Sequence, residues 1–208
     1  MAPTFIYPFL DYVDTRAEKM AEQRQVVVVT SLGKKFTGKM DVPNMTLRTT
    51  DLLNSGSIYW KDPSEKCFEN AILLHDVQLT IDDSAVCVKF DKIQVKLSEV
   101  IYFYDDSKSI SDEKEKMRAE AMIQKTKEHQ QTINIITTEI SQSFYHMTGF
   151  FYGLFKKKSN DKFIPLTGVK LIEIYKKEGK WFQKEVGVPH KFIGISTRHI
   201  EAVRITEG

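Results

Sequence analysis

The sequence predicts a mainly β fold with short helices, in the α+β class, and two observations carry this prediction. Residues 25–41 (QVVVVTSLGKKFTGKMD) contain an apolar run, a turn with a glycine and an alternating run, which is typical of a β-hairpin. A weaker copy of this pattern lies at 132–158, so that one helix followed by five strands occurs twice. Because closing a five-stranded sheet removes its exposed edges, we expect two tandem five-stranded barrels, each preceded by an α-helix.

The first copy begins with a segment at 11–24, where apolar residues recur at helical spacing between charged ones, and we expect a short amphipathic helix there. The hairpin of 25–40 follows. Residues 41–66, which contain two prolines and a glycine, interrupt the strand pattern and are expected to form an ordered insertion with a helical turn at 50–53. The remaining strands of this copy are expected at 71–81, 86–97 and 100–104.

The second copy begins at Ser111, which is suited to cap a helix at 112–130 with an acidic first turn. Gly153, which alternates with two phenylalanines, is expected to match Gly38, because a glycine inside a strand suits a point of sharp bending. The strands of this copy are expected at 133–140, 143–155, 163–174, 181–196 and 200–205.

The two copies give two predicted domains, residues 1–107 with the insertion at 41–66, and residues 108–208. The first has 12 Lys and Arg against 16 Asp and Glu, net −4, and the second has 18 against 12, net +6. Opposite charges favour head-to-tail association between copies of the chain, for example a pseudo-sixfold ring of three chains, or contact of the basic half with a polyanion. Chance drift of surface charge between related halves is the other interpretation.

The first residues, MAPTFIYPFLDYVD, lack the basic segment of an export signal, and no apolar run reaches the length that spans a membrane. Cys67 and Cys87 are too few for a disulfide framework and lie in apolar runs, where we expect reduced, buried thiols. These features predict a cytoplasmic protein without a membrane partner.

The motifs QVVVVTSLGKKFTGKMD with LLHDVQL, and KIQVKLSEVIYF, are similar to the two sequence motifs of the Sm-like (LSm) family. The phrases DLLN at 51–54 and FIPLTGV at 163–169 also resemble an uncharacterised bacterial β-rich family. The resemblance covers most of the chain and rests mainly on hydrophobic patterns. It implies small barrels of the Sm-like or SH3-like kind that assemble through their strand edges.

Sm-like proteins that bind RNA place an Asp and an Asn after their second strand, and Asp41 and Asn44 stand near that position in the first copy. Asn160 and Asp161 stand there in the second copy. The Arg-Gly pair that such proteins place before their last strand is missing here, since 97–99 is Leu-Ser-Glu and 196–198 is Ser-Thr-Arg. The resemblance alone therefore does not imply RNA binding.

A basic cluster follows a run of aromatic residues near the end of the second hairpin. Lysines neutralise phosphates and aromatic rings stack on bases, so this combination favours single-stranded nucleic acid. A solvated lysine-rich turn beside core aromatics is the other interpretation. The residues of this candidate nucleic-acid site are Tyr152, Lys156, Lys157, Lys158, Asn160 and Lys162.

Other motifs do not indicate catalysis. Residues 33–40 resemble a phosphate-binding loop, but Met40 replaces the hydroxyl that would hold magnesium and no long helix follows, so a hairpin is expected. The five histidines lack metal-ligand spacing, and no nucleophile motif organises the serines. Trp60 and Trp181 are expected to be buried. We therefore assign no catalytic residue, metal or cofactor.

These observations predict a non-enzymatic interaction or assembly module built from two Sm-like barrels. The alternative is a protein that binds RNA or another single-stranded nucleic acid through its basic second half.

Overall fold

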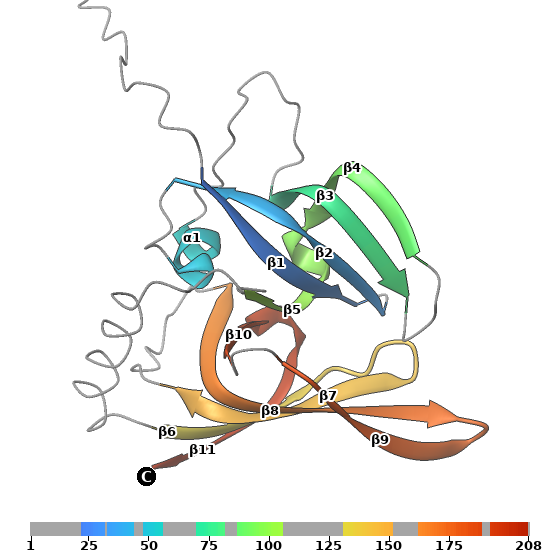
Figure 1. Ribbon diagram of the computed structural model, residues 1–208. Coiled ribbons are helices and arrows are strands. Elements are labelled where there is room, and N and C mark those ends of the chain that lie inside the picture. Colours follow the sequence, from blue (N-terminus) through green and yellow to red (C-terminus); the bar gives the residue numbers. More distant parts are fainter. Residues whose placement is uncertain are drawn as a thin grey trace, which may run out of the picture.

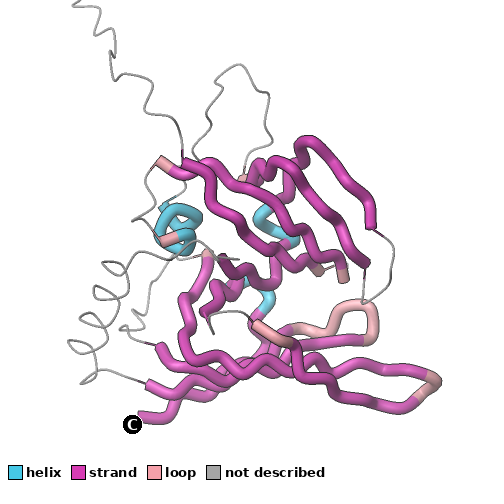
Figure 2. Tube along the Cα trace, viewed as in Figure 1, coloured by secondary structure: helices cyan, strands magenta, loops and turns pink. Residues whose placement is uncertain are grey.

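The computed structural model describes residues 22–31, 33–43, 48–55, 70–81, 87–105, 131–151, 162–188 and 192–207. These residues form a mainly β structure, as Figures 1 and 2 show, and this confirms the predicted class. They include one short α-helix. The elements of the first half are β1 (Glu22–Thr30), β2 (Lys34–Val42), α1 (Thr49–Ser55), β3 (Ala71–Ile81), β4 (Cys87–Lys96) and β5 (Val100–Asp105). Those of the second half are β6 (Gln131–Thr137), β7 (Ser143–Phe151), β8 (Phe163–Lys177), β9 (Lys180–Val186), β10 (Phe192–Ser196) and β11 (Ile200–Glu207).

Most strands and the helical turn of the insertion lie where the sequence predicts them, and β3 has the predicted bounds. The helix predicted at 11–24 is wrong at its end, because residues 22–24 belong to β1. The rest of that segment, and the helix predicted at 112–130, lie outside the described residues. The strand predicted at 181–196 is two strands, β9 and β10, which pair with different parts of the long strand β8.

All strands of the described residues belong to one antiparallel sheet in the order β11-β6-β7-β8-β10-β5-β1-β2-β3-β4, and β9 pairs with β8 beside this path. The prediction of two closed barrels is therefore wrong. The physical reason lies at β5, which pairs with β1 on one side and with β10 of the second half on the other. Because both edges of β5 are already paired, β4 is unable to pair with β5 and close the first half into a barrel. The domain boundary near residue 107 falls outside the described residues and stays a prediction.

The two halves nevertheless repeat in detail. In each half a 3-10 turn, at Leu97–Glu99 and at Thr197–His199, joins the last two strands. Each turn is fixed by the same two backbone hydrogen bonds at nearly equal lengths. These are Ser31 N to Glu99 O (2.8 Å) and Thr138 N to His199 O (2.9 Å), and Leu97 N to Asn70 O (2.8 Å) and Thr197 N to Lys162 O (2.9 Å).

The bending glycines occupy equivalent places, with one correction to the predicted register. A Cβ at Gly38 would meet Val77 at 2.9 Å, and a Cβ at Gly149 would meet Val169 at 3.2 Å, the equivalent residue in β8. Each glycine thus lets the neighbouring strand approach closely. The expected equivalence of Gly38 with Gly153 is therefore wrong; Gly149 occupies that place, and Gly153 lies outside the described residues.

The core consists of two apolar clusters on opposite sides of β1 and β5. In β1, Val26 and Val28 face the cluster of the first half, whereas Val27 and Val29 face that of the second half. This explains the unbroken run of four valines, because a strand buried on both faces is apolar at every position. Figure 1 shows β5 and β10 lying between the two halves.

The segment 33–40 forms the predicted hairpin and not a phosphate-binding loop. Gly33 has φ of 67° in the turn, and its N–H donates to Thr30 O at 3.1 Å. Gly38 then lies within β2. In the part of the chain that the structure describes, no helix is long and apolar enough to cross a membrane.

Candidate assembly interface

The seam between the halves is formed by β10 and β5. Their register pairs Gly194 with Phe103 and Ile195 with Tyr102. A Cβ at Gly194 would fall on the Phe103 ring, so only glycine lets this ring lie against β10. Phe103 also meets Phe163 of β8 edge to face, with ring centroids 5.2 Å apart. The seam is therefore packed as tightly as a protein interior.

The face of β1 and β5 that points toward the second half is apolar and fully covered. Val27, Val29, Tyr102 and Tyr104 are each at most 6% exposed. Tyr102 meets Tyr145 of β7 edge to face at 5.2 Å, and burial raises the pKa of the Tyr102 hydroxyl well above its ordinary value. The phenol therefore stays neutral, as its apolar surroundings require.

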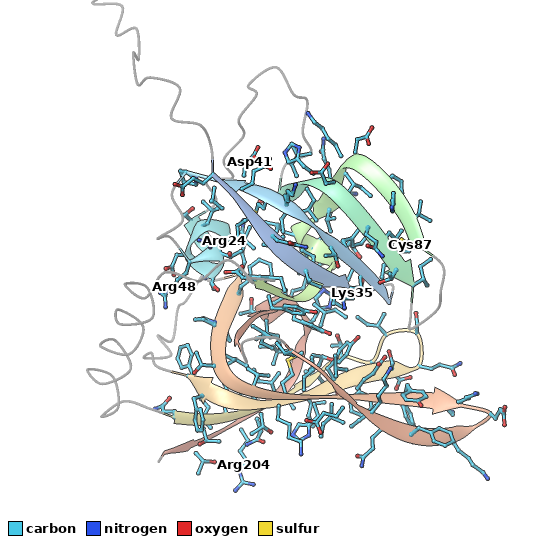
Figure 3. The ribbon with its side chains drawn as sticks, viewed as in Figure 1. Arg24, Lys35, Asp41, Arg48, Cys87 and Arg204 are labelled. Carbon is cyan, nitrogen blue, oxygen red and sulfur yellow. The ribbon has the colours of Figure 1, made fainter. Side chains whose placement is uncertain are left out.

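Helix α1 connects the insertion to the second half. The side chain of Asn54 donates to Phe163 O and accepts from Phe163 N, both at 2.9 Å, so it replaces a neighbouring strand at the start of β8. At the other end of α1, Arg24 donates to Thr49 Oγ1 at 2.9 Å, and Thr49 donates to Asp105 at 2.6 Å. These contacts fix α1 against both halves. Figure 3 shows Arg24 beside α1.

The equivalents of the seam strands lie at the two ends of the sheet. By the repeat, β4 corresponds to β10, and β11 corresponds to β5. Within the described residues, β4 pairs only with β3 and β11 pairs only with β6. Figure 1 shows β4 and β11 on opposite sides of the molecule. The equivalents of the two seam strands therefore lie apart from each other within one chain.

The side chains of β11 show the effect of the missing neighbour. Val203, the equivalent of Phe103, pairs with Ile135 on the core side of the sheet and is 50% exposed, whereas Phe103 is 1% exposed. Ile205, on the same side, is 41% exposed. Large apolar side chains that face a core from an uncovered edge mark a surface for a partner.

The register of the internal seam predicts the register of the second one. With that register, Gln94 would lie opposite Val203, and Lys96 would lie opposite Glu201. Lys96 and Glu201 have opposite charges. Strand β4 carries Lys89, Lys92 and Lys96, and lysines along an edge discourage pairing of two β4 strands with each other. The edges therefore favour β4 with β11 over two like edges.

Two residues of the predicted nucleic-acid site lie in the described region, and each has its own partners. Asp41 is 5% exposed and accepts from Gln23 Nε2 at 3.0 Å. His75 Nε2 lies 3.2 Å from the other Asp41 oxygen without hydrogen-bond geometry. Lys162 Nζ donates to Asn70 at 2.9 Å, across the two halves.

The other residues of that predicted site are Asn44, Tyr152, Lys156, Lys157, Lys158 and Asn160, and they lie outside the described residues. No common site is therefore described for them, and the prediction of nucleic-acid binding there stays a prediction.

Two expectations of burial are wrong. Cys87 is exposed at the start of β4, because the outer side of that strand has no neighbour in the described region (Figure 3). Trp181 is 49% exposed on β9, which pairs only with β8 within that region. Cys67 and Trp60 lie outside the described residues.

Among the described residues, no three His, Cys, Asp or Glu side chains are grouped closely enough to hold a metal ion. His199 instead lies against the first half, with Nε2 3.0 Å from Ser98 O. Comparison with protein-family models, curated proteins and solved structures gives no significant match. The similarity to the Sm-like family therefore rests on the sequence patterns.

Proposed function

We propose that this protein is a non-enzymatic assembly module whose copies join head to tail, the β4 edge of one chain pairing with the β11 edge of the next. The observation that carries the proposal is the pairing of β10 with β5, because the equivalent strands β4 and β11 have one neighbour each in the described region. The net charges of the two halves, −4 and +6, favour the same head-to-tail order.

A head-to-tail contact uses two different surfaces, so it forms a closed ring or an open filament. We propose a closed ring of three chains, in which six equivalent seams alternate between internal and intermolecular. The resemblance to Sm-like proteins supports strand-edge assembly.

The test is a disulfide across the proposed seam. Gln94→Cys and Val203→Cys are introduced together in a chain whose Cys67 and Cys87 are changed to serine. Directly opposed residues of antiparallel strands have Cα atoms about 4.5–5.5 Å apart, which a disulfide spans. We expect mild oxidation to give covalent oligomers with a trimer as the largest main species, and reduction to reverse this.

The matched control replaces Val203→Cys by Thr206→Cys, three positions further along the same strand and about 10 Å away. This pair should give no covalent trimer. Light scattering supplies the second measurement, with the unmodified chain at high protein concentration and low salt. A monomer under these conditions, or equal cross-linking of both cysteine pairs, would contradict the proposal.

A further inference from the structure

The hairpin of β8 and β9 projects from the rest of the second half (Figure 1) and carries exposed aromatic rings. Trp181 is 49% exposed and Phe182 is 45% exposed, although they are neighbours in sequence. Adjacent residues of a strand point to opposite faces, so each face of the hairpin presents one large ring. A hairpin that served only to extend the sheet would not require these two exposed aromatic rings.

The first face combines an aromatic pair with a lysine. Trp181 lies opposite Lys176 in the register, and Lys176 Nζ lies 5.9 Å from the centroid of the Trp181 ring. Phe144 of β7 meets Trp181 edge to face at 5.7 Å. These contacts hold the indole in place at the surface.

The second face places an aromatic pair beside two lysines. Tyr175 and Phe182 are stacked, with centroids 5.8 Å apart and ring planes 24° apart. Next to them, Lys177 and Lys180 lie directly opposite each other. Like charges in this position destabilise a hairpin, and Glu178 in the turn offsets them only in part. A bound anion would remove the remaining repulsion.

The corresponding turn of the first half has the opposite character. There β3 is followed by Asp82-Asp83-Ser84, whereas β8 is followed by Glu178 and Gly179 between Lys177 and Lys180. Strand β3 ends at Ile81, the equivalent of Glu173, so among the described residues the first half has no counterpart of the part of β8 that carries Tyr175 and Lys177. The basic, aromatic hairpin is therefore a feature of the second half and not a requirement of the repeated fold.

We propose that the β8–β9 hairpin binds single-stranded nucleic acid, with a base stacking on Phe182 and phosphates lying near Lys177 and Lys180 on the same face. Unpaired bases stack on exposed rings, and lysines neutralise the backbone without reading its sequence. A duplex keeps its bases stacked inside and offers the hairpin only its phosphates. The proposed site lies outside the assembly edges and does not depend on the proposed function.

A membrane surface fits the hairpin less well. Its tip is Lys177-Glu178-Gly179-Lys180, which is polar throughout, and its rings are divided between two faces. A segment that enters the interface of a bilayer has one continuous apolar face. Glu173 and Glu185 also lie along the hairpin, where anionic lipids would repel them.

The test measures fluorescence anisotropy of a labelled, unstructured oligonucleotide of about 12 nucleotides with the full chain at about 50 mM salt. Phe182→Ala should weaken binding by about 5- to 150-fold, because one base no longer has a ring to stack on. Changing Lys177 and Lys180 together to Gln should reduce the slope of log affinity against log salt by about 1.4, or about 0.7 for each phosphate that is no longer neutralised.

The matched control is Lys35→Gln, at an exposed lysine of β2 that lies away from the hairpin and from both open edges, and it should leave affinity unchanged. Val203→Lys on the β11 edge should leave the effect of Phe182→Ala unchanged, which separates this proposal from head-to-tail assembly. Thermal unfolding of each variant confirms that it folds, and the exposed lysine pair provides a test even if a ring variant unfolds.

Three results would overturn the proposal. The first is an absence of binding at low salt. The second is binding that the hairpin variants do not alter, or that a duplex of equal length matches. The third is hairpin-dependent binding of anionic phosphatidylserine vesicles in place of the oligonucleotide.

Discussion

The internal seam and the open edges use equivalent strands and differ in what covers them. Phe103 in the seam is 1% exposed, whereas its equivalent Val203 at the open edge is 50% exposed. On the opposite face of the sheet, Val29 is 6% exposed and its equivalent Ile136 is 40% exposed. The backbone pairing of these residues is the same in both halves. Cover from the other half, by a neighbouring strand for Phe103 and by the second apolar cluster for Val29, therefore decides burial.

The two places also differ in composition. Tyr102 and Tyr104 cover the seam, whereas the equivalent positions of β11 are Ala202 and Arg204 (Figure 3). The seam is thus suited to permanent contact and the open edges to a weaker, reversible one, because less apolar area is available for burial. The following predictions test this difference, from the largest expected effect to the smallest.

Gly194→Ala should lower the free energy of unfolding by about 3 kcal/mol, because the added Cβ falls on the buried Phe103 ring. Urea unfolding followed by circular dichroism measures this decrease. Gly187→Ala is the matched control, since nothing lies within 4 Å of a Cβ there, and its stability should be unchanged or slightly higher. Equal decreases at both glycines would show that the seam is not closely packed.

Asn54→Ala should lower the free energy of unfolding by about 2 kcal/mol, because it removes both hydrogen bonds to Phe163. Asn54→Asp keeps the acceptor but places a carboxylate oxygen against Phe163 O, so it should be at least as destabilising. Because the open edges do not involve α1, light scattering should show assembly unaltered in the folded protein. A variant that unfolds like the original chain would contradict the role of α1 in joining the halves.

Val203→Lys should weaken head-to-tail assembly at least about tenfold, because a charge replaces the apolar edge. In the single chain the free energy of unfolding should change by only about 0.5 kcal/mol, since the side chain is half exposed. Sedimentation velocity measures the assembly. Phe182→Lys, at a side chain of similar exposure away from both edges, should assemble normally, and equally weakened assembly in both variants would argue against the edge.

The smallest effect concerns Glu99, the equivalent of His199. The Ser31 hydroxyl donates to Glu99 at 2.9 Å and, with Ser98, lowers the pKa of that carboxyl. A folded pKa below the unfolded one gives stability above about pH 4.3 that is lost as the pH falls through the folded pKa. Ser31→Ala should therefore cost a few tenths of a kcal/mol at pH 7, because water screens the site. Urea titrations should show this cost decreasing as the pH falls below about 4.3 and through the folded pKa.

Strands could be predicted from sequence because each depends on a local alternation of apolar and polar residues. The pairing of β5 with β10 could not be predicted, because β10 lies far along the chain and no residue near β5 indicates this partner. One signal was available in the four valines of 26–29, because an unbroken apolar strand indicates burial on both faces. A barrel strand with one solvated face would have alternated.

The register of the second hairpin was predicted four residues too far along. Met147, Gly149 and Phe151 alternate as Phe151, Gly153 and Phe155 do, so the local pattern fits both. Packing against Val169 and Leu166 of β8 selects Gly149. The exposed rings of β9 were missed for a related reason, since alternation marks a strand but does not show whether a neighbouring strand covers it.

The pairing of β5 with β10 also has a consequence for synthesis. Strand β10 begins about 90 residues after β5 ends, and a ribosome adds about 5–20 residues each second. For roughly 5–20 s the nascent chain therefore carries a finished, apolar β5 edge with no partner. Neighbouring ribosomes on one message would hold such edges close together. Translation pauses before residue 192 should thus promote misassembly between nascent chains.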